Sequence, residues 1–173
     1  MSRLFWIEVG TAGRIAIVAR PRAGDWLDRE IDEWKIAGLD VVVCLLERQE
    51  IVELELQREG EFCRARGIDF VSFPIPDRGV PAIDDAAEVA RVIAVGLRDG
   101  RSIAIHCRAG IGRSSIMAAC ALTFSGIEPE HALTLIKAAR GLNVPDTDEQ
   151  RDWVMAFGKA VAPWGVSARR PAT

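Results

Sequence analysis

The 173-residue chain has no apolar run close to the length of about 18 residues that a membrane-spanning helix requires. Residues 4–9 are apolar except for Glu8, so this stretch is too short and too polar for a signal peptide. A basic excess is also missing, because 22 lysines and arginines face 25 aspartates and glutamates, giving a net charge of -3. We therefore expect a cytoplasmic protein that binds neither membranes nor nucleic acid.

Closely paired cysteines are absent as well. The four cysteines, Cys44, Cys63, Cys107 and Cys120, form no CxxC spacing, so no structural zinc site is expected. A chain that stays in the cytoplasm keeps such thiols reduced. The cysteines are therefore expected to serve as core residues or as reactive thiols, and not as disulfide partners that hold the fold together.

The sequence predicts one domain over residues 1–162 and a C-terminal tail over residues 163–173. Hydrophobic residues make up 49% of the chain, which is enough for a substantial core. The predicted strands are residues 3–9, 14–19, 39–46, 68–73 and 102–106. The predicted helices are residues 25–37, 49–66, 83–97, 113–124, 130–139 and 146–159.

Two patterns decide the fold class. Residues 39–46 (LDVVVCLL) form a continuous run rich in β-branched residues, which is typical of a central parallel strand covered on both faces. In the first predicted helix, Trp26, Leu27, Ile31 and Trp34 are spaced to share one face. Because strands alternate with helices, we predict an α/β fold with a mostly parallel central sheet flanked by helices. The role of residues 1–24 is left open, as a hairpin covering the sheet or as a recognition edge.

Residues 106–115 (HCRAGIGRSS) carry the chemistry, in a predicted strand–loop–helix layout. Gly110 and Gly112 allow a tight turn whose amides point inward at a helix N-terminus, which favours a bound anion. Arg113 offers a planar fork for two phosphate oxygens. The same positive field stabilises Cys107 as a thiolate nucleophile facing that phosphate. The predicted phosphate-binding positions are Arg108, Ala109, Gly110, Ile111, Gly112 and Arg113.

Two different phosphate-binding loops are excluded. The nucleotide P-loop needs the pattern G-x-x-x-x-G-K-[ST], and this segment has no such lysine. The dinucleotide-binding fingerprint needs a third glycine, which is missing after Gly112. The loop is therefore expected to bind a phosphoryl group for chemistry at Cys107.

The segment resembles the Cys-x5-Arg signature of the protein tyrosine phosphatase superfamily, in its longer form His-Cys-x-x-Gly-x-x-Arg-Ser. Together with the loop PIPDRGVP, at residues 74–81, it is similar to the dual-specificity branch, and within that branch to the cyclin-dependent kinase-associated type. The resemblance covers residues 39–157. It implies a strand–loop–helix active site and an enzyme that needs no metal or other cofactor.

The same resemblance implies roles for further residues. Asp77, located 30 positions before the cysteine, would be the general acid; Asp84 and Asp85 are rival acids that also suit the start of the next helix. Ser114 would stabilise the thiolate when it leaves, and His106 would order the loop. The chain contains no tyrosine, whereas tyrosine-specific enzymes deepen their pocket with one, so phosphoserine and phosphothreonine are expected to fit as well.

The roles of Cys44 and Gln150 stay open. Cys44 is either a core thiol of a strand or, as in some similar phosphatases, a partner that protects the nucleophile through a disulfide. Gln150 is either a solvated helix residue or the water-orienting glutamine of some relatives.

The predicted function is removal of phosphate from phosphotyrosine, phosphoserine or phosphothreonine of proteins through a phosphocysteine intermediate, with a phosphorylated kinase as a possible partner. A competing hypothesis is a phosphatase of an inositol phosphate, a phospholipid headgroup or an RNA 5′ phosphate. Arg108 occupies the place of a lysine in phosphoinositide phosphatases, although Ile111 replaces their second lysine. A phosphate-binding module without turnover is a third hypothesis, and a sulfurtransferase is a fourth, although the Cys-x5-Arg-Ser ending suits phosphate better than sulfane sulfur.

Overall fold

The structure is a computed structural model that describes residues 2–162. Five strands form one sheet in the order β1-β2-β5-β3-β4. Their bounds are Phe5–Ile7 (β1), Arg14–Ala19 (β2), Val41–Cys44 (β3), Asp69–Ser72 (β4) and Ser102–Cys107 (β5). Only the pairing of β1 with β2 is antiparallel. The predicted α/β fold with a mostly parallel sheet is confirmed.

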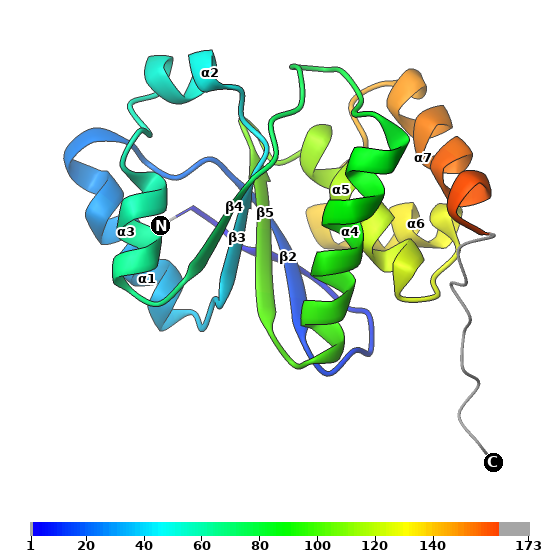
Figure 1. The fold of residues 1–173 in the computed structure, drawn as a ribbon, viewed down its shortest axis with the longest axis horizontal. Helices are drawn as coiled ribbons and strands as arrows, with labels where there is room; N and C mark the ends of the chain where they lie inside the picture. The colour runs from blue at the N-terminus through cyan, green and yellow to red at the C-terminus, as the bar shows by residue number, and fades with distance from the viewer. Residues whose placement is uncertain (1, 163–173) are drawn as a thin grey trace.

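Helices cover both faces of the sheet (Figure 1). One side carries a short 3-10 turn (Gly24–Trp26), α1 (Leu27–Ile36), α2 (Arg48–Glu53) and α3 (Glu59–Ala65). The other side carries α4 (Ile83–Arg98), α5 (Arg113–Phe124), α6 (Pro129–Arg140) and α7 (Asp148–Val161). No helix within residues 2–162 is both long and apolar enough to cross a membrane.

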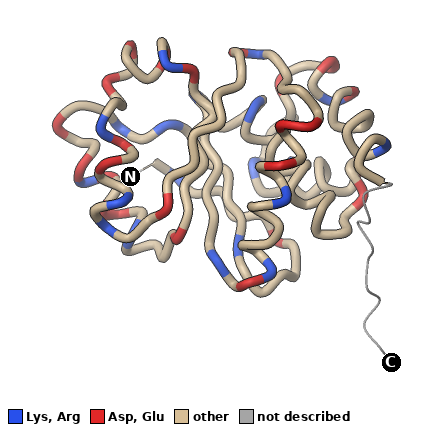
Figure 2. The backbone as a smooth tube through the Cα atoms, in the orientation of Figure 1, with Lys and Arg blue, Asp and Glu red and all other residues tan. Residues whose placement is uncertain are grey.

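The alternation of side chains along β3 shows why this strand is apolar throughout. Val41 and Val43 belong to the core cluster under α4–α7, whereas Val42 and Cys44 belong to the cluster under α1 and α3. A parallel strand covered on both faces has no solvent side and therefore needs no polar alternation. Charged residues gather on the helices and connections, and the middle of the sheet is mostly uncharged (Figure 2).

Two helical expectations are wrong in detail. Residues 49–66 form two helices, α2 and α3, because the chain turns at Glu55 (φ 56°) and buries Leu56 in the cluster under α1. In the first predicted helix, Leu27, Ile31 and Trp34 are buried together, but Trp26 is 55% exposed because it ends the preceding 3-10 turn. A periodic pattern alone does not show where a helix changes direction.

The first 24 residues extend the sheet. β2 lies beside β5 and β1 forms the edge, so the N-terminal segment is part of the sheet and not a hairpin laid over it. The predicted tail, 163–173, lies outside the described residues, and the domain boundary at residue 162 stays a prediction. The carboxyl ends of β3, β4 and β5 meet at one edge, where ligands bind in open α/β sheets.

Candidate active site

Cys107 is the last residue of β5 and is 3% exposed. Burial raises the pKa of its thiol, but hydrogen bonds outweigh burial, and the pKa lies below its ordinary value. The donors are the Ser114 hydroxyl, 3.5 Å from Sγ, and the backbone amides of Gly110, Ile111 and Ser114. The arrangement favours a thiolate at the N-terminus of α5, where unpaired amides and the helix dipole both favour negative charge.

Glycine is required at two positions of this loop. Gly110 has a φ of +67°, and a Cβ there would lie 2.7 Å from the carbonyl oxygen of Val18. A Cβ on Gly112 would lie 2.8 Å from Oε1 of Gln150. The two glycines therefore let the loop pass close to β2 on one side and to α7 on the other.

Arg113, the first residue of α5, is buried and held by an acid that the sequence did not point to. Its Nη1 donates to Oε2 of Glu50 at 2.6 Å and to the carbonyl oxygen of Ile75 at 3.0 Å. Its Nη2 donates to Oε1 of Glu50 at 2.9 Å and lies 3.1 Å from Oδ1 of Asp77. A guanidinium has five N–H groups, so the Nε proton and the Nη2 proton facing Asp77 are the ones available to a phosphate.

Asp77 lies in the segment between β4 and α4, with a side chain that is 61% exposed. Its ion pair with Arg113 places the carboxylate beside the predicted phosphate site. The rival acids, Asp84 and Asp85, are exposed in the first turn of α4 and do not line the cavity around Cys107. The geometry thus favours Asp77 as the acid.

A cavity of about 280 Å³ opens over the cysteine. It is lined by Asp77, Arg78, Cys107, Arg108, Ala109, Gly112, Arg113, Asp146 and Gln150. The structure thus brings the predicted acid, nucleophile and clamp together with most of the predicted phosphate-binding positions. Of the rest, Gly110 and Ile111 supply amides to the thiol, and Ser114 lies beneath it.

Gln150 is buried in the cavity wall, so the hypothesis of a solvated helix residue is wrong. Its Nε2 donates to the carbonyl oxygen of Gly79 at 3.2 Å, and its Oε1 accepts from the amide of Asp146 at 3.1 Å. The side chain therefore connects the loop of Asp77 to the start of α7. One N–H and one lone pair of the carboxamide are left for a ligand or water.

Arg108 lies at the rim of the cavity, with 43% of its side chain exposed. Its Nη2 donates to Oε1 of Glu53 at 2.7 Å, and its Nε lies 3.8 Å from Oε1 of Glu50. These acids neutralise much of the positive charge that a polyphosphorylated headgroup would need.

His106 faces the other side of the sheet, behind the loop. Its Nε2 lies 2.9 Å from Oε1 of the buried Glu59, and its ring lies near Trp34, with centroids 6.2 Å apart. Burial lowers the pKa of His106, but the negative charge of Glu59 outweighs it and the pKa is raised well above its ordinary value. An imidazolium–carboxylate pair therefore supports the strand that ends in Cys107.

Cys44 lies in this same buried group. Ligand atoms of Cys44, Glu59 and His106 all lie within 4.8 Å of one another, so these residues are the described set that could hold a metal ion. The His106–Glu59 ion pair accounts for their arrangement without one. The thiol of Cys44 packs on the opposite face of the sheet from Cys107, which does not suit a disulfide between the two.

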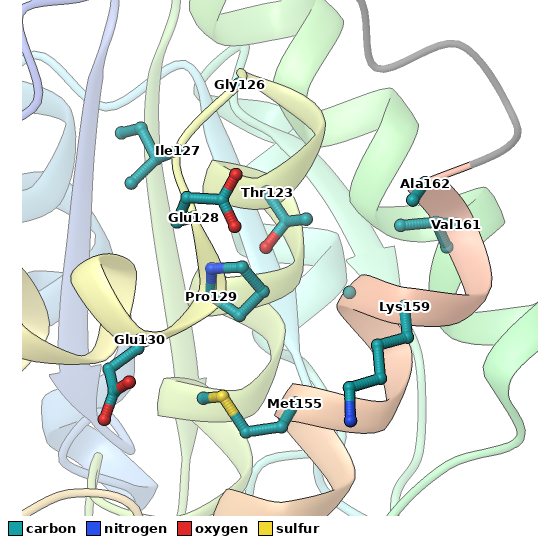
Figure 3. A pocket seen from close by; sticks show the side chains of 11 residues that line it. Thr123, Gly126, Ile127, Glu128, Pro129, Glu130, Met155, Lys159, Val161 and Ala162 are labelled. Carbon is teal, nitrogen blue, oxygen red and sulfur yellow. The ribbon is translucent and has the colours of Figure 1, made fainter.

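A second, larger cavity of about 570 Å³ lies away from the cysteine, between the end of α5, the start of α6 and the end of α7 (Figure 3). Pro129, Met155 and Lys159 are among its lining residues. None of the predicted catalytic side chains reaches this cavity.

The sequence did not point to three acids of this site: Glu50, Glu59 and Asp146. Glu50 carried a usable signal, because it follows β3 at the edge where the strands end and forms a capping box with Glu47 at the start of α2. Glu59 and Asp146 carried none, since each reaches its position only through the tertiary fold.

The fold, the cysteine loop and the helix that follows define a member of the cysteine-dependent phosphatase superfamily, in its dual-specificity branch. The chain belongs to the cyclin-dependent kinase inhibitor 3 (CDKN3) family, whose sequence profile matches residues 22–133. It is 28% identical over 140 residues to cyclin-dependent kinase inhibitor 3 of Rattus norvegicus, covering 80% of this chain and 66% of that protein. The chain thus spans slightly less than two thirds of the length of this relative.

Solved structures agree with this assignment. A structure of kinase associated phosphatase (KAP) matches with a TM-score of 0.82 at 22% identity, covering 93% of this chain and 96% of that one. The active form of Tk-PTP matches with a TM-score of 0.71 at 30% identity, covering 85% of this chain and 92% of that one.

Proposed function

We propose that this protein hydrolyses phosphate monoesters of phosphotyrosine, phosphoserine or phosphothreonine in proteins, through a phosphocysteine intermediate. The observation that carries the proposal is the position of Cys107. Its thiol is buried under a cavity, receives hydrogen bonds from the loop amides and faces the cation of Arg113. A thiolate next to a preformed phosphate cradle is an activated nucleophile.

In the first step, Sγ of Cys107 attacks phosphorus, and the bond from phosphorus to the leaving oxygen breaks. The loop amides and the free N–H groups of Arg113 stabilise the charge on the non-bridging oxygens. Asp77 gives its proton to the leaving oxygen. Its exposure and its contact with Arg113 support this role, because the carboxyl lies at the mouth of the cavity where the leaving group exits.

In the second step, a water molecule attacks the phosphocysteine, Asp77 accepts a proton from it, and the S–P bond breaks. The Ser114 hydroxyl, 3.5 Å from Sγ, stabilises the departing thiolate. Gln150 lies in the wall with free hydrogen-bonding capacity, which suits it to hold this water. No step uses a metal ion.

The substrate is proposed to be a phosphorylated protein. Relatives named for cyclin-dependent kinase inhibition and for association with a kinase favour a phosphorylated kinase. The free thiols Cys44, Cys63, Cys107 and Cys120 suit a reducing compartment such as the cytoplasm. The pairing of Arg108 with Glu53 argues against an inositol phosphate or lipid headgroup as the main substrate.

The test is hydrolysis of p-nitrophenyl phosphate and of phosphopeptides in EDTA by the wild type, Cys107→Ser and Asp77→Ala. We expect metal-independent turnover that disappears in Cys107→Ser and is strongly slowed in Asp77→Ala. Full activity in Cys107→Ser, or no turnover by the reduced wild type, would overturn the proposal and favour a phosphate-binding module.

A further inference from the structure

Two arginines from distant parts of the chain stack on one phenyl ring. Cζ of Arg3 lies 4.9 Å from the ring centroid of Phe5, and Cζ of Arg140 lies 3.9 Å from it. Arg3 lies just before β1, and Arg140 is the last residue of α6. Cation–π contacts of this kind fix the direction of two otherwise flexible side chains.

This cationic pair lies in line with the catalytic cysteine. The antiparallel register pairs Phe5 with Ile17, which places Arg3 opposite Ala19, and Ala19 in turn pairs with Cys107. Two strand spacings put the Cα atoms of Arg3 and Cys107 about 10 Å apart. Residues paired in this way point to the same face of the sheet, so the cations and the thiol share one side.

The pair has no acidic counterpart. Within residues 2–162, neither Arg3 nor Arg140 has a carboxylate partner, and Nε of Arg140 is buried without a hydrogen-bond partner. Burial lowers the pKa of Arg140, and so does the charge of Arg3, whereas a Cys107 thiolate raises it. Arginines elsewhere beside the site are paired, as Arg108 is with Glu53. Two close guanidinium groups without an anion are a place where an anion is missing.

We propose that Arg3 and Arg140 form a second anion-binding site, which holds an acidic side chain or second phosphate of a peptide whose phosphorylated residue occupies the Cys107 cradle. This inference rests on the proposed function, and names the class of phosphopeptide that the enzyme prefers. An extended peptide advances about 3.3 Å per residue, so a spacing of two or three residues between the anionic groups matches the distance.

The experiment compares phosphopeptides that differ only two and three residues from the phosphorylated position, where each carries alanine, glutamate or a non-hydrolysable phosphoserine analogue. The enzymes are the wild type, Arg3→Gln, Arg140→Gln and the double variant. Arg91→Gln is the matched control, because Arg91 also stacks on an aromatic ring, that of Phe124, but lies on α4. Thermal melting checks that each variant folds, and the exposed Arg3 is the substitution that disturbs packing least.

We expect the wild type and Arg91→Gln to prefer the anionic peptides by about tenfold in kcat/KM, and the double variant to lose this preference. Equal kcat/KM for all peptides in the wild type, or an unchanged preference in the double variant, would overturn the second site. A stronger preference for an inositol bisphosphate than for any peptide would overturn the peptide assignment. Peptide binding to Cys107→Ser is measured in parallel, so failure of turnover alone would count against the proposed function and not against this site.

Discussion

Glu50 binds both terminal nitrogens of Arg113, at 2.6 Å and 2.9 Å, from a helix that lies 63 residues earlier in the chain. The arginine is therefore fixed before any phosphate arrives, and the side of its fork that faces the cavity is kept for the ligand. The hydrogen bonds from Arg113 hold the pKa of the Glu50 carboxyl below its ordinary value of 4.5, so the acid remains an anion near neutral pH. A clamp held in this way loses little conformational entropy on binding.

Replacing Glu50 with glutamine should lower both stability and activity. The change leaves the buried charge of Arg113 without its anion, and we expect a loss of about 3 kcal/mol in the free energy of unfolding. Because the folded-state pKa of Glu50 is lowered, its contribution is present above pH 4.5 and is lost as pH falls below that value. Urea unfolding at pH 7 and pH 3.5 measures both effects, and the deficit should shrink at the lower pH.

Glu53→Gln is the matched control for that experiment. Glu53 belongs to the same helix and also pairs with an arginine, Arg108, but the two side chains are 61% and 43% exposed. Solvent screens such a pair, so the change in stability should stay within about 0.5 kcal/mol. Equal destabilisation by the two substitutions would show that the Glu50–Arg113 pair has no special role.

The thiol of Cys107 should react at lower pH than the other buried thiols. Its lowered pKa gives a thiolate fraction at neutral pH, whereas burial raises the pKa of Cys63 to about 12 and that of Cys120 well above its ordinary value. Iodoacetamide should therefore label Cys107 before Cys63 or Cys120. The labelling rate should rise with pH and level off below pH 9, the ordinary thiol value.

Ser114→Ala should move that labelling profile to higher pH, because the hydroxyl and its amide are among the groups that stabilise the thiolate. Ser115→Ala is the matched control, since Ser115 is equally buried in the same turn but is not among those donors. The rate of labelling is read by mass spectrometry across the pH range. A profile unchanged in Ser114→Ala would argue that the amides alone stabilise the thiolate.

The nucleophile and the clamp could be predicted from the sequence because they lie in one continuous segment. Cys107, Gly110 and Arg113 are local to a strand–loop–helix unit, and local spacing determines their geometry. Glu50 and Asp146 belong to segments that reach the site only when β3, β5 and α7 pack. Their positions depend on tertiary contacts that no periodicity encodes.

The same distinction applies to the fold. The order of strands and helices was predictable, since each strand after the N-terminal hairpin is a short apolar run separated from the next by a helical pattern. The break between α2 and α3 was not, because the helical composition of residues 49–66 hides a turn that exists to bury Leu56. The pairing of β2 with β5 was equally hidden, because it joins residues about ninety positions apart.

Gly110→Ala should impair catalysis more than it impairs folding. A Cβ there would meet the carbonyl oxygen of Val18 at 2.7 Å, so the loop must move away from its amide geometry around the thiol. A displacement near 1 Å in such a site costs about a hundredfold in rate. Gly100→Ala is the control, because its φ of +85° carries a similar backbone strain, about 1 kcal/mol, with no atom within 4 Å of the new Cβ.

Comparison of the two glycine variants separates strain from clash. Both should melt at somewhat lower temperature than the wild type, whereas only Gly110→Ala should lose most of its kcat on p-nitrophenyl phosphate. If Gly100→Ala lost activity to the same degree, the effect would come from general destabilisation and not from the loop.

Asp77→Asn should slow the enzyme in a way that depends on the leaving group. If Asp77 protonates the departing oxygen, an alcohol such as phosphoserine, which leaves poorly without a proton, should suffer a loss of about a thousandfold in kcat/KM. p-Nitrophenol leaves as a stable anion and should suffer much less. Asp84→Asn, at the exposed first turn of α4, should leave both rates near the wild-type values. An equal loss for both substrates would mean that Asp77 acts by holding Arg113, which it contacts at 3.1 Å, and not as an acid.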